Sequence, residues 1–393
     1  MTEKREIYLD NSATTPLTER VKAAMREAME VYGNPSSLHP VGQAAHRLLE
    51  DARRHVMQSL GVRPMSADAG KLFFTAGGTE ADNLAILGTA YAKPRRRGGR
   101  IVTTDSEHAG VEKTLQTLEA DGFEVVRIST RDGVLDMEQY EKALTPSTFL
   151  VTMMMVNNET GALYDVTRAF SRAKALRPDI VTHTDAVQGY LKCRFTPRAI
   201  KADLVTVSSH KIHGPKGVGA LYVSPDAIKR RDLSPTVHGG GQEEGFRSGT
   251  ENLIGIAGFG AAAEEGTASL AADLAHLTDL RDYTCGRLAE LPVLLNLPAG
   301  DRAPHIVNVT IPDIRSETVL HALSTDGICV SNGAACSSHG QKTHSPLIAF
   351  GRTQAQMESS IRISFGRQNT REDVDALISS LNAAIVRLVR AKH

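Results

Sequence analysis

The chain has 393 residues, of which 41% are hydrophobic and 23% charged, which is typical of a globular protein of about two or three domains. Basic and acidic residues both number 45, so the net charge gives no indication of binding to nucleic acid or to a membrane surface. The N-terminal stretch MTEKREIYLD lacks the apolar core of a secretory signal, and no apolar run is long enough for a membrane helix. The four cysteines form no CxxC pair, so we expect reduced thiols and a cytoplasmic location.

Short apolar runs alternate with helical patterns from about residue 45 to residue 260. This alternation predicts an α/β fold with a mainly parallel sheet and helices on both faces. Polar clusters follow several of the strands: GGTE, SEH, NNE, DAVQ and SSHK. Because ligands bind beyond the carboxyl ends of the strands in such sheets, we expect these clusters to converge. The predicted strands cover residues 71–75, 100–104, 124–128, 149–155, 180–184, 204–207 and 220–223.

The last third of the chain has a different composition. An Ala-, Glu- and Leu-rich run predicts a helix over 262–290, followed by a strand IVNVTI and a loop around Cys336. A second strand, IRISF, and an amphipathic helix that ends near Arg390 complete this part. We therefore predict a large domain over 15–261 and a smaller α+β domain formed by 1–14 and 262–393.

Three clusters at strand ends suggest a site for an anionic cofactor. GGTE, at 77–80, follows a strand and opens a helix, so free backbone N–H groups could meet an anion; a plain turn capped by Thr79 is the alternative. The chain has no GxxxxGK[ST] motif, which disfavours a P-loop. Lys211, in SSHKIHGPKG, stands at a strand end where a desolvated amine could form a Schiff base, whereas Lys216 lies in an apparent turn. Asp185 ends THTD and could pair with a pyridinium nitrogen or cap a helix.

A second set of residues could handle sulfur and a carboxylate. Cys336 lies among small residues in SNGAACSSHG, which is typical of an exposed thiol. Cys329 has apolar neighbours and is predicted to be structural, as are Cys193 and Cys285. Arg362, in the strand SSIRISFG, could hold a carboxylate through two parallel hydrogen bonds.

Taken together, the motifs resemble those of the cysteine desulfurases in order and spacing across nearly the whole chain. The motifs are EHAGV, NNETG, DAVQ, SSHKIHGPKG, GGGQEEGFRSGT and NGAACSS. The resemblance implies a pyridoxal-phosphate (PLP) enzyme of fold type I, similar to aspartate aminotransferase, with a seven-stranded sheet in its large domain. It also implies a homodimer with active sites at the subunit interface, and a reaction in which L-cysteine yields L-alanine while Cys336 takes the sulfur as a persulfide.

The resemblance gives roles to individual residues. Lys211 would be the Schiff-base lysine, Asp185 the partner of the pyridine nitrogen, and His108 a ring-stacking residue that assists proton transfer. Thr250 would reach the phosphate of the neighbouring subunit, and Arg362 would bind the substrate carboxylate. Gln188 and Asn158 would lie near the phenolic oxygen of the cofactor, with Asn158 also near the substrate, while Gly78, Thr79, Ser208 and His210 would bind phosphate; no metal is expected.

Several alternatives remain open at this point. Another PLP enzyme of the same fold, such as an aminotransferase or a selenocysteine lyase, would share most of these residues. A non-catalytic scaffold that docks sulfur acceptors is a third alternative. The sequence before Cys336 reads NGAA where related chains often have SGSA. The sulfur acceptor could be an iron–sulfur scaffold, a relay for tRNA thiolation or a DNA-modification pathway.

Overall fold

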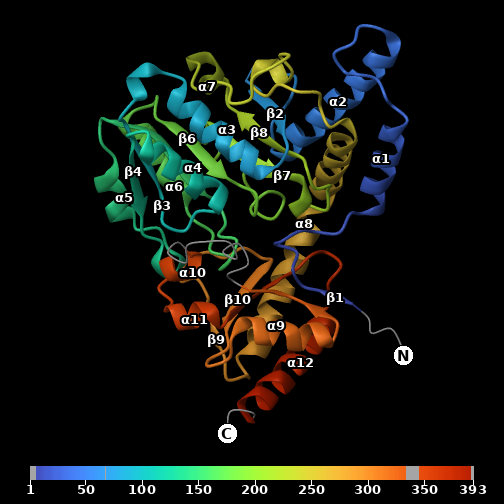
Figure 1. Ribbon diagram of the computed structural model, residues 1–393, viewed down its shortest axis with the longest axis vertical. Helices are drawn as coiled ribbons and strands as arrows, with labels where there is room; N and C mark the ends of the chain where they lie inside the picture. Colours follow the sequence, from blue (N-terminus) through green and yellow to red (C-terminus); the bar gives the residue numbers. More distant parts are fainter. Residues whose placement is uncertain (1–5, 67, 333–344, 391–393) are drawn as a thin grey trace.

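The computed structural model describes residues 6–66, 68–332 and 345–390, and consists of a large α/β part and a smaller α+β part (Figure 1). The large part is built on a seven-stranded sheet with the order β2-β8-β7-β6-β5-β3-β4. Each predicted strand of the large part is confirmed, with bounds that differ by at most one residue. The strands are β2 (Lys71–Thr75), β3 (Arg100–Thr104), β4 (Glu124–Ile128), β5 (Thr148–Met154), β6 (Val181–Asp185), β7 (Leu204–Ser208) and β8 (Gly219–Val223).

The central sheet is parallel except for β8, which runs antiparallel to both β2 and β7. The connection from β7 to β8 covers only 209–218, which is shorter than the dozen or more residues that a parallel crossover requires. Strands β5, β6, β7 and β8 are buried along their whole length. This burial on both faces explains why they read as continuous apolar or Thr-rich runs without polar alternation.

Helices cover both faces of the sheet, and successive side chains of a strand point to different layers. Leu72 and Phe74 of β2 pack into the core that contains Phe259, whereas Phe73 packs into the core on the other face. The first core receives α1 (Glu19–Met29), α2 (Pro40–Ser59), α5 (Met137–Ala143), α6 (Val166–Leu176) and the start of α8 (Leu253–Leu288). The second core receives α3 (Gly78–Tyr91), α4 (Ala109–Ala120) and α7 (Pro225–Arg230).

The smaller part has its own apolar core around an antiparallel sheet with the order β12-β13-β10-β9. The N-terminal strand β1 (Ile7–Tyr8) pairs with β11 (Ile328–Cys329), so the beginning of the chain packs with this part. The other elements are β9 (Leu294–Leu295), β10 (Ile306–Thr310), β12 (Ser331–Asn332), β13 (Ser360–Ser364), α9 (Ser316–Thr325), α10 (Pro346–Ala349), α11 (Gln354–Glu358) and α12 (Arg371–Arg390).

The long helix α8 connects the two parts. The predicted start at residue 262 is wrong: the helix begins at Leu253, where Asn252 accepts a hydrogen bond from the Gly255 amide. The first turns are buried against α1 and α2, and the later turns pack against α12. The predicted domain boundary at 261/262 stays a prediction and would fall inside this helix. None of the described helices is long and apolar enough to cross a lipid bilayer.

Candidate active site

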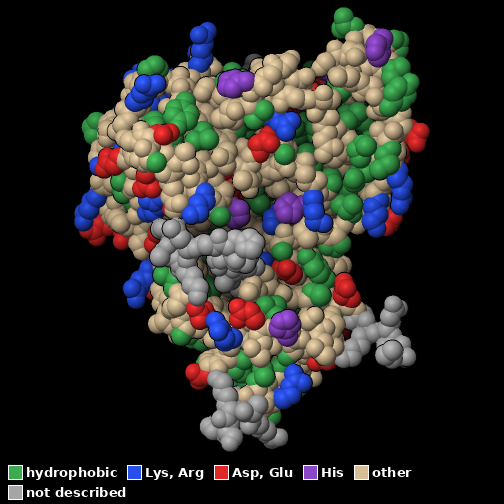
Figure 2. All heavy atoms as spheres, in the orientation of Figure 1, with side chains coloured by type: hydrophobic (Ala, Val, Ile, Leu, Met, Phe, Trp, Pro, Cys, Tyr) green, Lys and Arg blue, Asp and Glu red, His purple; other side chains and the backbone are tan. Residues whose placement is uncertain are grey.

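A cavity of about 360 Å³ lies at the carboxyl ends of the central strands. The small part closes one side of it through Ser331 and Arg362. Histidine and basic side chains gather at the waist where the two parts meet (Figure 2). Thr250 is exposed and does not line the cavity, and Cys336 lies outside the described residues. The predicted site residues that do line it are Gly78, Thr79, His108, Asn158, Asp185, Gln188, Ser208, His210, Lys211 and Arg362.

One end of the cavity is suited to a phosphate group. Helix α3 begins at Gly78 without a side-chain cap, so the N–H groups of its first turn face the cavity unclaimed by a capping side chain. The buried Ser208 hydroxyl has no hydrogen-bond partner among the described residues. A Cβ on Gly78 would lie only 2.8 Å from Val187 Cγ2, so the close approach requires glycine. Orphaned donors around a helix N-terminus are what a phosphate would satisfy.

Lys211 ends the short turn η3 (Ser209–Lys211) directly after β7. Its Nζ donates hydrogen bonds to the carbonyl oxygens of Ser12, at 2.6 Å, and Ala13, at 2.8 Å. These carbonyls belong to the segment that follows β1. The amine is therefore held at the cavity wall by backbone acceptors. Hydrogen bonds to neutral carbonyls are weaker than an ion pair with a buried carboxylate, so the lysine can exchange them more readily.

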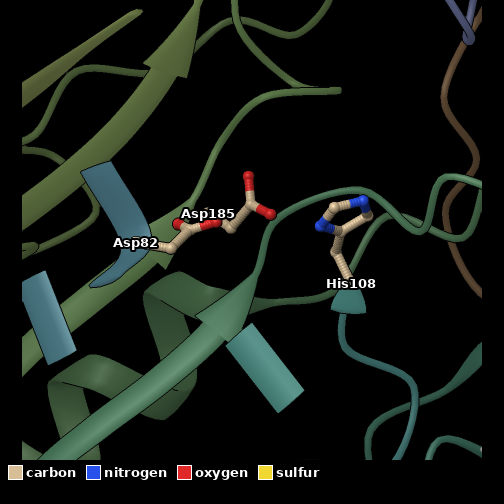
Figure 3. A group of neighbouring side chains, drawn as sticks. All are labelled: Asp82, His108 and Asp185. Atoms are coloured by element: carbon tan, nitrogen blue, oxygen red, sulfur yellow. The ribbon is translucent and has the colours of Figure 1, made fainter. Parts of the chain in front are cut away.

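The centre of the cavity wall carries two carboxyl groups and an imidazole. In the view of Figure 3 the Asp185 carboxyl lies between Asp82 and the His108 ring. Asp185 ends β6 and accepts a hydrogen bond from the Val187 amide at 2.9 Å. Burial raises the pKa of Asp185, while the positive charges of His108 and Lys211 oppose that shift. An anionic Asp185 held in this way could pair with a pyridinium nitrogen.

His108 follows β3 and is the N-cap of α4. Its Nδ1 accepts a hydrogen bond from the Gly110 amide at 3.0 Å, which fixes the ring at the start of the helix. Burial lowers the pKa of His108; Asp185 opposes this shift, and Lys211 adds to it. An imidazole beside a carboxyl group can act as a proton donor or acceptor.

Gln188 and Asn158 complete the floor of the cavity. The Gln188 side-chain amide donates to the Ser12 carbonyl at 3.0 Å, and its oxygen lies 3.2 Å from His305 Nε2. Asn158 donates to Glu159 Oε1 at 3.1 Å, and its own side-chain oxygen has no partner among the described residues. This buried oxygen is an acceptor that a bound molecule could satisfy, since Asn158 lines the cavity.

The side of the cavity opposite the large sheet carries one guanidinium group. Arg362, on β13, donates to the Asn158 carbonyl at 2.9 Å and to Glu159 Oε1 at 3.3 Å, and its Nη2 lies 3.0 Å from Asp10 Oδ1. Burial raises the pKa of Glu159 to about 7, although Arg362 lowers it. A guanidinium with a partner carboxyl that titrates near neutrality could exchange that partner for a substrate carboxylate.

Several polar residues of the site were not predicted from the sequence. Asp82, Glu159 and Asp10 belong to the cavity or to its hydrogen bonds. Glu107 is buried beside it, accepts from the Met154 amide and from Thr104, and has its pKa raised by burial to about 8. The available signal was an acidic residue inside a buried stretch: Asp82 stands in ADNLAIL, and Glu107 and Glu159 stand within the quoted motifs.

The described cysteines are free thiols away from this cavity. Cys193 packs against the core of the large part, and burial raises the pKa of its thiol to about 12. Cys285 packs against the core of the small part, and burial raises its pKa as well. Cys329 lies in β11 with a raised pKa, again because of burial. Raised pKa values keep these thiols protonated and weakly nucleophilic.

The residues present fit PLP. Its phosphate would meet the start of α3, Ser208 and His210; its aldehyde carbon would meet Lys211; and its ring nitrogen would meet Asp185. The cavity volume falls within the range of about 300–1,000 Å³ that is common for cofactor sites. The observation that supports this fit is a pair of buried polar atoms without partners among the described residues, Ser208 Oγ and Asn158 Oδ1, which belong to residues that line the cavity.

Comparison with known proteins agrees with this geometry. The family model of class-V aminotransferases matches residues 7–377. The cysteine desulfurase IscS of Dictyoglomus turgidum is 36% identical over 98% of this chain and 96% of its own length. The structure of a NifS-like protein superposes with a TM-score of 0.89 at 34% identity, over 97% of this chain and all of the other. The structure of SspA in complex with cysteine gives a TM-score of 0.76 at 30% identity, over 92% of this chain and 99% of the other.

These matches extend over both parts of the molecule, including the cavity between them. They agree with the PLP-dependent fold of type I that the resemblance of the sequence motifs implied. The chain therefore belongs to the class-V aminotransferase family and, within it, to the cysteine desulfurases, which are PLP-dependent enzymes.

Proposed function

We propose that this protein removes sulfur from free L-cysteine, releases L-alanine, and carries the sulfur as a persulfide on Cys336. The observation that supports this function best is the composition of the cavity. A buried carboxyl and an imidazole lie close together, an amine lines the same cavity, and a guanidinium lines it from the other part of the molecule. The solved complex of the related SspA contains cysteine, which supports the same substrate here.

The side chains that line the cavity would have different roles in this reaction. PLP, when bound, would draw electron density away from the substrate Cα, which makes the proton on that carbon acidic. Lys211 and His108 would move protons to and from the substrate, because both line the cavity beside Asp185. Asp185 would keep a proton on the ring nitrogen, and Arg362 would hold the substrate carboxylate.

The sulfur step would belong to Cys336. Its thiolate would attack the substrate sulfur, so that an S–S bond forms while the C–S bond of the substrate breaks; a proton returned to the carbon side then leaves alanine. The carbon skeleton of the substrate leaves as alanine, and its sulfur stays on Cys336 as the persulfide. This step needs no outside oxidant or reductant.

The assembly and the destination of the sulfur complete the proposal. We infer a homodimer in which Thr250 of each subunit contributes to the phosphate site of the other, because Thr250 is exposed and away from its own cavity. The acceptor would be a protein of an iron–sulfur or other thiolation pathway, in the cytoplasm.

A pair of cysteine variants tests the proposed reaction. In Cys336→Ser, assayed with a thiol reductant that releases persulfide sulfur as sulfide, we expect alanine and sulfide formation from L-cysteine to fall to background, while the yellow absorbance of bound PLP stays. Cys329→Ser is the matched control and should keep the activity, since Cys329 lies in β11 with a raised pKa. Full desulfuration by Cys336→Ser would contradict the role of Cys336, and a wild-type protein that binds no PLP would contradict the function itself.

A further inference from the structure

A second carboxyl group lies beside Asp185 in the cavity wall. Asp82 comes from the first turns of α3, whereas Asp185 ends β6, so two different elements bring them together. Their carboxyl oxygens and a ring nitrogen of His108 all lie within 4.8 Å of one another (Figure 3). Asp82 is 1% exposed and Asp185 is 6% exposed. We propose that Asp82 stays protonated and thereby keeps the single negative charge of this pair on Asp185.

The surroundings of Asp82 offer no positive charge to stabilise an anion. His183 Nε2 lies 3.7 Å from Asp82 Oδ1, but the two ring nitrogens of His183 are within hydrogen-bond distance of the Thr152 and Thr206 hydroxyls. Burial lowers the pKa of His183 to about 3, so the ring is neutral. Asp82 Oδ1 has no hydrogen-bond partner among the described residues. A carboxylate there would have a side-chain hydrogen bond with Thr206 but would remain a buried charge without a cationic partner, which is costly.

Asp185 has the opposite environment. It accepts the Val187 amide hydrogen bond, and the charges of His108 and Lys211 favour its anionic form. Two carboxylates this close in a buried site cannot both ionise, so one takes a proton. Burial first and then repulsion from Asp185 raise the pKa of Asp82 well above its usual range; a side-chain hydrogen bond with Thr206 opposes this shift, and Glu107 adds to the repulsion. The titratable groups that face the pair thus place the proton on Asp82.

The consequence concerns the cofactor and therefore rests on the proposed function. If Asp185 pairs with the ring nitrogen of PLP, one negative charge balances one positive charge in a buried site. An ionised Asp82 would leave an excess negative charge beside that pair. A neutral Asp82 avoids this excess charge. Asp82 is thus a positioning residue that acts through Asp185.

Infrared spectroscopy of the full chain, freed of its cofactor, tests where the proton sits. Protein labelled with carboxyl-¹³C aspartate should show the C=O stretching band of a protonated aspartic acid near pH 8. That band should be absent from Asp82→Asn. In Asp185→Asn the band should disappear at a pH about one unit lower or more than in the wild type, because the neighbouring charge is gone. Absence of the band from wild-type protein near pH 8 would overturn the proposal without recourse to any variant.

Cofactor binding provides a second readout. Asp185→Asn should weaken PLP binding about tenfold or more, the cost of losing a hydrogen bond to a charged group. Asp82→Asn should lose less affinity for PLP than Asp185→Asn, because asparagine resembles the neutral acid in shape and charge. An equal or greater loss in Asp82→Asn would show that Asp82 carries the charge. If wild-type protein shows the infrared band but binds no PLP, the proposed function fails while the proton assignment stands.

Discussion

At the scale of single residues, the least expected group is Lys192, a buried lysine near the partly exposed Lys211. The Nζ of Lys192 has no hydrogen-bond partner among the described residues. Burial first and repulsion from Lys211 next lower its pKa to about 7, from 10.5 in an exposed lysine. Because the unfolded chain binds this proton more tightly, the group destabilises the fold at and below pH 7, and its penalty shrinks as the pH rises toward 10.5.

Replacing this lysine should therefore stabilise the protein. We expect Lys192→Met to raise the free energy of unfolding near neutral pH by about 1–4 kcal/mol, the range for exchanging buried charged groups for apolar ones. Urea unfolding of the two cofactor-free proteins at pH 7 and pH 9.5 measures the difference, which should narrow at the higher pH. A destabilised Lys192→Met protein at pH 7 would indicate that the amine has an essential partner.

Arg362 gives a prediction about substrate binding. A lysine at this position keeps the charge but loses the planar pair of donors that matches a carboxylate. We expect Arg362→Lys to raise KM for L-cysteine about tenfold or more. Steady-state alanine formation measures this, with PLP absorbance as the control for an intact cofactor site. An unchanged KM would place the substrate carboxylate elsewhere.

The sequence predicted which residues would surround the cavity better than it predicted their charge states. Strand-end positions such as Asp185 and Lys211 follow from the topology of a parallel sheet. Asp82 was not predicted, because its role depends on the approach of α3 to the end of β6, which no local pattern encodes. The partners of Arg362 were also missed, since Asp10 is more than 350 residues away along the chain.

At the scale of elements, one buried ion pair joins α2, β2 and the turn η4 (Glu243–Gly245) at the edge of the sheet. The Arg53 guanidinium makes two hydrogen bonds to the Glu243 carboxylate, at 2.8 and 2.9 Å, and a third to the Leu72 carbonyl at 2.7 Å. Glu243 also accepts the Phe74 amide of β2 at 2.8 Å. Since the Glu243 side chain is only 2% exposed, its charge depends on Arg53.

Removing the arginine alone should therefore be costly. We expect Arg53→Met to lower the free energy of unfolding by about 3–5 kcal/mol, because it leaves a buried carboxylate unpaired. Adding Glu243→Gln to that variant should recover part of the loss, which chemical denaturation of the single and double variants will measure. Strictly additive losses would mean that the two side chains do not depend on each other.

The elements themselves were predictable where their pattern is local. Strands of four to seven residues bounded by polar clusters were located to within one residue. The start of α8 was missed because Leu253–Ala261 is apolar on every side, so it lacks the periodicity that identifies an amphipathic helix. The antiparallel direction of β8 follows from a short connection, which the predicted strand bounds alone did not identify.

At the scale of the whole molecule, α8 is the element that both parts share. Its 36 residues run from the core beside α2 to the core beside α12, and its middle, around Ala272, is exposed between them. The cavity takes Lys211 from one part and Arg362 from the other, so its shape depends on how this helix holds the parts.

A kink in the middle of α8 should impair catalysis more than folding of either part. Proline at position 272 would lose a backbone hydrogen bond and clash with the preceding turn, at a cost of about 3 kcal/mol. We expect Ala272→Pro to lower kcat/KM about tenfold or more, while Ala272→Gly, which costs about 1 kcal/mol, keeps most of the activity. Circular dichroism checks that both variants are folded. Equal activity of the two would mean that the straight helix does not set the cavity.

The segment that follows β1 connects the small part of the molecule with the cavity residues of the large part. It starts in the small part, where β1 pairs with β11, and ends with the two carbonyl oxygens that hold Lys211. Ser12 also accepts from Gln188, so the segment reaches two cavity residues of the large part. It is a short stretch of chain between the β1–β11 pair and the acceptors of the Lys211 amine. The position of the small part and the acceptors of the lysine amine are therefore set by the same few residues.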